Sequence, residues 1–133
     1  VGQSITAAHA IAGTARGSLP APYGAAVATL DVVYGAPMWG FAMLWLALAT
    51  TLTVHAVRSS PSGLPFSLGW WSFTFPVGTV VTATSGLAAA TGAPVLAGAA
   101  VVAFVGLVGA WLVVATRTAR AVGSGALLGA AAA

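Results

Sequence analysis

Residues 36–57 read APMWGFAMLWLALATTLTVHAV, a stretch that carries no Asp, Glu, Lys or Arg and that ends directly before Arg58. A helix that crosses the hydrocarbon core of a bilayer needs about 20 consecutive, mainly apolar residues. This stretch meets that requirement, and the arginine after it is a typical end signal at the membrane surface. The stretch therefore predicts a transmembrane helix.

Further apolar stretches lie on both sides of the first one. Residues 67–90 and 95–115 are also long enough to cross a bilayer, whereas residues 1–13 are apolar but too short. We interpret residues 1–13 as the end of a helix. The predicted fold class is all-α, a polytopic transmembrane helical protein, and the chain is expected to supply about three and a half helices, as the C-terminal portion of one longer transporter domain.

The predicted connections follow from turn residues. Thr91-Gly92-Ala93-Pro94 is a short turn, so the second and third spans should form an antiparallel hairpin. Residues 13–34, with two prolines, are expected to be the longest connection, and residues 58–65 to be a loop. The Gly- and Ala-rich residues 121–133 are expected to be a frayed or disordered tail.

The composition excludes several classes of protein. Hydrophobic residues make up 59% of the chain and charged residues 4%, whereas a soluble domain is about 25% charged. Disordered chains need low hydrophobicity, and nucleic-acid-binding domains need a basic stripe, which four scattered arginines do not form. Cysteine is absent, which excludes disulfides and thiol nucleophiles. A membrane protein remains, with the lipid bilayer as its surroundings and no nucleic acid as a partner.

The arginines give an orientation. If each span crosses once, Arg58 lies on the same side as Arg117 and Arg120, and Arg16 lies on the opposite side. Because positive residues concentrate in cytoplasmic segments, the C-terminus is predicted to be cytoplasmic in a multi-pass protein of the cell membrane.

The second span opens with an unusual run, LPFSLGWWSFTFP, over residues 64–76. Trp70 and Trp71 at the start of a span are typical anchors at the headgroup level. Pro76 and Gly78 lie just inside the span and predict a helix break. Such breaks occur at membrane depth where protein or a water-lined cavity satisfies the freed carbonyl group.

Helical spacing places four residues of the second span on one face, at i, i+4, i+7 and i+11: Phe75, Thr79, Thr82 and Gly86. One interpretation is a pore wall, with an aromatic constriction and hydroxyl groups that bond a partly dehydrated anion. The other is that the threonines bond back to their own helix while the phenylalanine packs against a neighbouring helix. The spacing alone leaves both open.

The remaining motifs have structural interpretations. The third span has a small-residue face suited to close helix packing, made of Ala99, Ala103, Gly106 and Ala110. Arg16 and Asp31 are expected to be solvated loop charges, and His55 to be interfacial. His9 could belong to a pathway, but it is expected to lack an acidic partner, and a lone histidine is weak evidence for one. No catalytic set, phosphate loop, cofactor site or metal-ligand cluster is recognisable, so the sequence does not indicate an enzyme.

The run from Leu64 to Pro76 resembles the ninth helix of the tellurite-resistance/dicarboxylate transporter family, which includes plant slow-type anion channels, malate transporters and sulfite efflux pumps. Residues 40–46 (GFAMLWL) resemble its eighth helix, and residues 2–4 (GQS) part of its seventh. The third full span would be its tenth.

The resemblance implies ten helices, arranged as five hairpins around a central pore, commonly in a homotrimer. Odd-numbered helices line the pore, both termini are cytoplasmic, and a phenylalanine of the ninth helix plugs the pore. Phe75 matches that position best, with Phe73 as the fallback. The expected cargo is a small anion of the C4-dicarboxylate (malate), sulfite, nitrate or chloride class. The alternative function is a small membrane subunit that transports nothing and packs against a larger complex.

Overall fold

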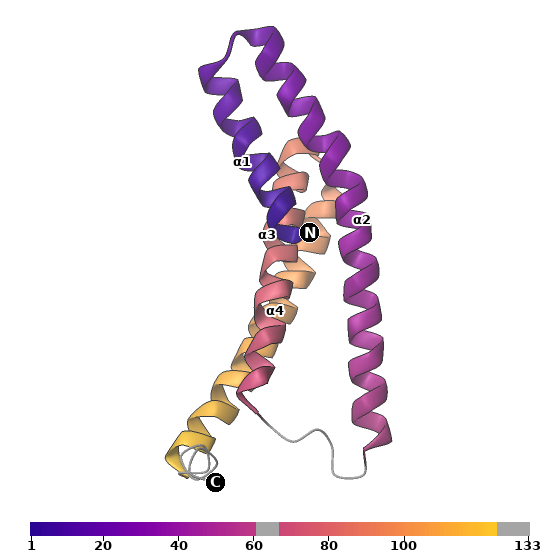
Figure 1. Cartoon of the computed structure of the whole chain (residues 1–133), viewed down its shortest axis with the longest axis vertical. Helices are drawn as coiled ribbons and strands as arrows, with labels where there is room; N and C mark the ends of the chain where they lie inside the picture. Colours follow the sequence, from indigo (N-terminus) through magenta and orange to yellow (C-terminus); the bar gives the residue numbers. More distant parts are fainter. Residues whose placement is uncertain (61–66, 125–133) are drawn as a thin grey trace.

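The computed structural model describes residues 1–60 and 67–124, and its regular secondary structure is helical (Figure 1). No strand occurs in this described part of the chain, in agreement with the predicted all-α class. The elements in chain order are α1 (Gly2–Ser18), α2 (Ala21–Ser59), the 3-10 helix η1 (Leu68–Phe73), α3 (Thr74–Thr91) and α4 (Pro94–Gly123).

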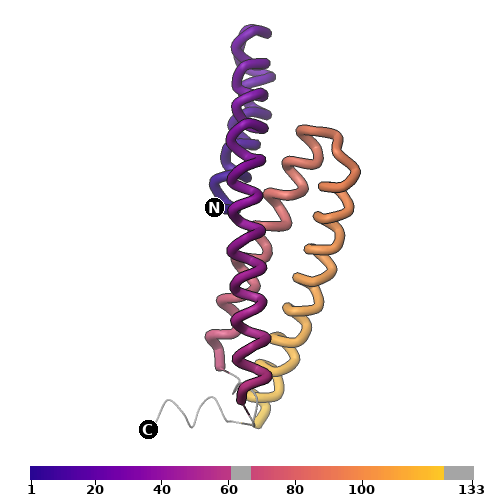
Figure 2. The backbone as a smooth tube through the Cα atoms, turned by 90° about the vertical axis from the view of Figure 1, so that its right-hand side faces the viewer, coloured from indigo at the N-terminus to yellow at the C-terminus, as the bar shows by residue number. Residues whose placement is uncertain are grey.

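The helices form two hairpins, α1 with α2 and α3 with α4 (Figures 1 and 2). The second hairpin turns at Gly92, whose φ of 67° lies in the left-handed region that favours glycine. Its N–H donates to the Ala88 carbonyl oxygen at 2.8 Å, and Pro94 then opens α4 at a position where a missing N–H costs nothing. The predicted turn and antiparallel hairpin are therefore confirmed.

The prediction of a long connection over residues 13–34 is wrong. α1 continues to Ser18 and α2 begins at Ala21, so only Leu19 and Pro20 separate the two helices. The prolines that indicated a loop lie at the helix start, where proline is tolerated in the first turn. Pro37, the second residue of the predicted span 36–57, lies inside α2, because the helix begins well before it.

The other predicted bounds differ at their edges. A 3-10 helix occupies the first part of the predicted 67–90 span, and α3 begins only at Thr74. α4 extends past residue 115 to Gly123, so the first residues of the predicted tail are helical. Residues 61–66, within the predicted loop, and residues 125–133 of that tail lie outside the described residues.

Within the described residues, three segments are long and apolar enough to cross a membrane, namely Ala21–Ser59, Leu68–Thr91 and Pro94–Gly123. α2 has 39 residues, which corresponds to about 58 Å at the usual helical rise. That is about twice the thickness of a hydrocarbon core. The α1–α2 hairpin accordingly projects past the turn between α3 and α4 (Figure 2).

A small core joins the two hairpins. Ile5 of α1 and both Ala83 and Leu87 of α3 are each at most 4% exposed. Gly35 of α2 lies against Ile5 and Leu87. A methyl group at Gly35 would lie 3.4 Å from Leu87 Cδ2, so glycine permits this close approach of α2. α1 and α3 therefore lie side by side at the centre.

The predicted packing face of α4 is only partly correct. Ala99 and Ala103 are half-buried, but Gly106 and Ala110 are exposed, and no atom lies within 4 Å of a methyl group placed at Gly106. Ala100 and Val114 are the buried residues of α4. The helix therefore packs through a face rotated away from the predicted small-residue stripe.

Candidate functional site

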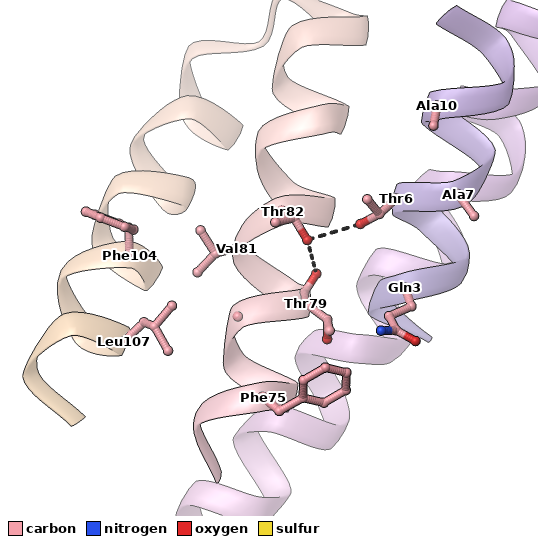
Figure 3. Close-up of a pocket in the computed structure, with 11 residues that line it drawn as sticks. Gln3, Thr6, Ala7, Ala10, Phe75, Thr79, Val81, Thr82, Phe104 and Leu107 are labelled. Atoms are coloured by element: carbon pink, nitrogen blue, oxygen red, sulfur yellow. Dashed lines mark hydrogen bonds between the residues drawn. The ribbon is translucent and has the colours of Figure 1, made fainter. Parts of the chain in front are cut away.

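An open cavity of about 770 Å³ lies along α1, α3 and α4 (Figure 3). α1 lines it with Gln3, Thr6, Ala7 and Ala10; α3 with Phe75, Gly78, Thr79, Val81 and Thr82; and α4 with Phe104 and Leu107. Its polar groups come from α1 and α3, whereas α4 contributes apolar side chains. Two helices that are far apart in sequence thus present hydroxyl and amide groups to one space.

Three of the four residues predicted to share a face line this cavity. Phe75 is 64% exposed, and its ring lies beside the Gln3 side chain (Figure 3). Thr79 and Thr82 follow along α3 in the same cavity wall. Gly86 lies beyond the cavity, where a methyl group would meet the ring of His9 at 3.1 Å.

The threonine hydroxyls bond to their own helix, as the second interpretation expects. Thr79 Oγ1 donates to the Pro76 carbonyl oxygen at 2.8 Å, and Thr82 Oγ1 donates to the Thr79 carbonyl oxygen at 3.1 Å. Thr82 Oγ1 also lies 3.1 Å from Thr6 Oγ1 across the α1–α3 contact (Figure 3). The two threonine hydroxyls are thus bonded to their own helix and also border the cavity. The local hydrogen bonds therefore do not decide between the two interpretations.

The sequence prediction missed the α1 side of the cavity. Gln3, Thr6 and Ala10 lie at i, i+3 and i+7, which places them on one helical face. That spacing could have identified them, but residues 1–13 were interpreted only as the end of a helix. The Gln3 side-chain amide makes no hydrogen bond within the described residues, so both of its N–H groups are uncommitted.

The fallback residue Phe73 lies elsewhere. It lines a second cavity of about 380 Å³, together with Trp70 and Val77 and with residues of α2 and α4. Phe73 is 53% exposed and does not line the cavity of Phe75. The structure therefore separates the two candidate phenylalanines onto different sides of the α3 region.

The helix is not broken at Pro76 and Gly78, where the sequence predicted a break. α3 is continuous through both residues, and the change from 3-10 to α-helix occurs between Phe73 and Thr74. Pro76 is the third residue of α3, within the first turn, where a proline fits without interrupting the helix. The irregular backbone therefore precedes the proline.

The tryptophans near this change contact the end of α4. Trp71 Nε1 donates to Thr118 Oγ1 at 3.1 Å, and the Arg117 guanidinium carbon lies 5.2 Å from the centre of the Trp70 ring. Both contacts join η1 to the arginine-bearing end of α4. This arrangement agrees with an anchoring role at the membrane surface.

The expectations for Asp31 and His9 are wrong. Asp31 lies within α2 and is 6% exposed, and its Oδ2 is 2.9 Å from Nδ1 of His9 on α1. The error followed from the loop prediction for residues 13–34, because only the helical pairing of α1 with α2 brings the two residues together. Within residues 1–60 and 67–124, no group of three or more His, Cys, Asp or Glu side chains could hold a metal ion.

Comparison with known proteins identifies relatives of this chain. A family model described as voltage-dependent anion channel matches residues 1–119. The sulfite efflux pump of Trichophyton rubrum is 40% identical over 48 residues, which cover 36% of this chain and 11% of that protein. An uncharacterized transporter of Methanocaldococcus jannaschii is 35% identical over 46 residues, 35% of this chain and 13% of that protein. No solved structure matches the chain.

These matches confirm the resemblance drawn from the ninth-helix motif and agree with the apolar helices. The matching family is one of anion channels, and the two relatives named above are a sulfite efflux pump and an uncharacterized transporter. The matched segments span a small part of each curated relative. Because the family model covers residues 1–119, the chain belongs to the voltage-dependent anion channel family of membrane proteins.

Proposed function

We propose that the chain is the C-terminal portion of a transmembrane transporter domain and that small anions pass along the cavity between α1 and α3, with Phe75 as the gate. The observation that carries this proposal is the exposed Phe75 ring, which lines one open cavity together with Gln3 and two threonine hydroxyl groups. The cavity lining contains no charged side chain. Anion passage would therefore depend on neutral hydrogen-bond donors.

The hydrogen bonds of the lining support this role. Gln3 offers two uncommitted N–H groups, whereas the hydroxyls of Thr79 and Thr82 must rotate away from backbone carbonyl groups before they can donate to an anion. Breaking such a neutral bond costs about 1 kcal/mol, and a bond to a charged group is worth about 1.5–3 kcal/mol. Each hydroxyl therefore gains free energy when it exchanges its backbone carbonyl acceptor for an anion. The gain is small, so the bound anion can still leave.

The finer assignments belong to the same proposal. The cargo is a small anion of the C4-dicarboxylate (malate), sulfite, nitrate or chloride class, and the sulfite efflux pumps among the relatives support sulfite as a first test substrate. The assembly is a homotrimer in the plasma membrane. The C-terminus is cytoplasmic. Three arginines support this placement, since positive residues concentrate on the cytoplasmic side. Arg58 lies in the last turn of α2, and Arg117 and Arg120 lie in the C-terminal part of α4.

The test compares two alanine variants of the full-length gene product in proteoliposomes or by patch clamp. Phe75→Ala removes the ring from the cavity and is expected to raise the anion conductance. Phe73→Ala is the matched control, because it removes the same ring from a different cavity and should leave the conductance near that of the wild type. Equal effects of the two variants would remove Phe75 from the gate.

Two further outcomes would contradict the larger proposal. A conductance that selects cations over anions would exclude the anion assignment. Absence of any flux, in both the wild type and the Phe75→Ala variant, would instead favour the membrane subunit that transports nothing.

A further inference from the structure

Asp31 is the only acidic residue of the chain, and it is buried between helices. It is 6% exposed on α2, and its Oδ2 lies 2.9 Å from Nδ1 of His9. A carboxylate without a partner is costly to bury, so the histidine contact accounts for its position. Polar pairs of this kind in transmembrane helices commonly belong to ion or proton pathways.

His9 lies about one helical turn beyond the polar residues that line the cavity. On α1 it follows Thr6 by three residues, and its ring lies against Gly86, which follows Thr82 by four residues on α3. A methyl group at Gly86 would approach Cδ2 of the ring to 3.1 Å, so the absence of a side chain gives the imidazole its room. The His9 side chain is 32% exposed.

The two ring nitrogens of His9 have different surroundings. Nδ1 is held by Asp31, whereas Nε2 makes no hydrogen bond within the described residues. When Asp31 is ionised, its carboxylate accepts hydrogen bonds only, so Nδ1 then carries a proton and donates it toward Asp31. In the neutral ring, Nε2 then presents a bare lone pair.

We propose that His9 is an anion-binding residue of the pathway, charged by uptake of one proton and oriented by Asp31. This inference rests on the proposed function, since it assigns a further residue to the same route. The proton comes from hydronium in the surrounding water: one O–H bond of the hydronium breaks, an N–H bond forms at the Nε2 lone pair, and a water molecule is left. Nε2 changes from an acceptor, which repels an anion, to a charged donor, which binds one.

Few other ionisable groups face this pair. α3 carries none between Thr74 and Thr91, and α1 carries only Arg16, about two turns beyond His9. On the adjoining half of α2 the others are Tyr23, which is 65% exposed, and Tyr34, whose hydroxyl donates to Ser4 Oγ. Proton uptake at His9 therefore changes the local charge without competition from a second histidine or carboxylate.

The experiment measures nitrate flux into liposomes that contain the full-length gene product, at intervals between about pH 8 and pH 5, the interval in which histidine is the side chain that ordinarily changes charge. Nitrate keeps its charge over this interval, whereas sulfite does not. The wild-type flux should rise about tenfold on acidification, because a charged donor binds an anion more strongly than a neutral one.

His9→Gln is the decisive variant. Glutamine can still donate to Asp31 but cannot take up a proton, so its flux should stay at the wild-type level of about pH 8 across the whole interval. His55→Gln is the matched control, because His55 is an exposed residue near the far end of α2. It should keep the full response. A response retained in His9→Gln, or lost in His55→Gln, would overturn the proposal.

A second variant covers the case in which His9→Gln does not fold, as judged by its size-exclusion profile. Asp31→Asn keeps the imidazole but replaces the carboxylate that holds Nδ1, so the ring is no longer fixed and the acid-induced rise in flux should be smaller than in the wild type. An unchanged profile would contradict the orienting role of Asp31. If the wild type carries nitrate without any pH response, this inference fails alone; if neither it nor Phe75→Ala carries nitrate at any pH, the proposed function fails with it.

Discussion

The contact between α1 and α3 depends on Gly2, and the substitution Gly2→Ala tests it most directly. A methyl group at this position would lie 2.5 Å from Thr79 Oγ1 and 2.8 Å from the Thr79 carbonyl carbon. Non-bonded carbon atoms pack at about 3.5–4.0 Å, so the two helices must separate by on the order of 1 Å. Rotation of the threonine side chain cannot relieve this clash fully, because one of the atoms belongs to the backbone.

The expected loss of stability has two opposing parts. Overpacking of this kind costs about 1–3 kcal/mol, and the higher helix propensity of alanine offsets up to about 1 kcal/mol. Gly13→Ala on the same helix is the matched control, because no atom lies within 4 Å of the added methyl group. Gly2 is the first residue of α1, where helix propensity counts for less than at the interior position of Gly13, so Gly2→Ala should be less stable than Gly13→Ala by at least the packing term, about 1–3 kcal/mol.

The assay is denaturant-induced or thermal unfolding of the purified full-length protein in detergent, followed for both variants under the same conditions. Anion flux gives a second readout, since a wider α1–α3 contact displaces Gln3 and Thr6 from the residues that face them. Equal unfolding free energies for the two variants would refute the conclusion that close approach at Gly2 holds α1 against α3.

Two further predictions concern the core between the hairpins. Leu87→Ala should lower the unfolding free energy by about 2–5 kcal/mol, because the side chain is 4% exposed and packs against Ile5; the same unfolding assay measures this loss, and a loss well under 1 kcal/mol would contradict it. Trp39→Phe removes the hydrogen bond of 2.9 Å from Nε1 to Thr84 Oγ1 and should cost about 0.6 kcal/mol, the average for polar pairs between transmembrane helices. A double-mutant cycle with Thr84→Val checks this coupling, and additive effects would show that it is absent.

Local patterns predicted the membrane class and the second hairpin well. Apolar length identifies a span without knowledge of its neighbours, and a Gly-Ala-Pro turn specifies its own geometry. Patterns failed between residues 13 and 34, because prolines at the N-cap and in the first turn of α2 are also typical of loops. A weakly polar segment becomes helical there because α1 and α2 pack along each other, and no local signal contains that contact.

The candidate site divides in the same way. The row of Phe75, Thr79 and Thr82 follows from helical spacing within one helix, and these residues do line a common cavity. Spacing could not predict what lies opposite them, because Gln3 and Thr6 belong to a helix about 70 residues earlier in the chain. Helical spacing also could not predict that Phe75 and Phe73 line different cavities, since the cavity that each ring lines depends on which helices lie on each side of α3.

The amino-acid sequence by itself determined that this protein lies in a membrane, since hydrophobic length and scarcity of charge depend on residue type alone. It also determined the family through the motif from Leu64 to Pro76. Only the tertiary structure decided that Asp31 is buried against His9 and that the polar face of α3 meets α1. Those contacts join residues 22 and 76 positions apart, and such distant pairs are selected by the packing of whole helices.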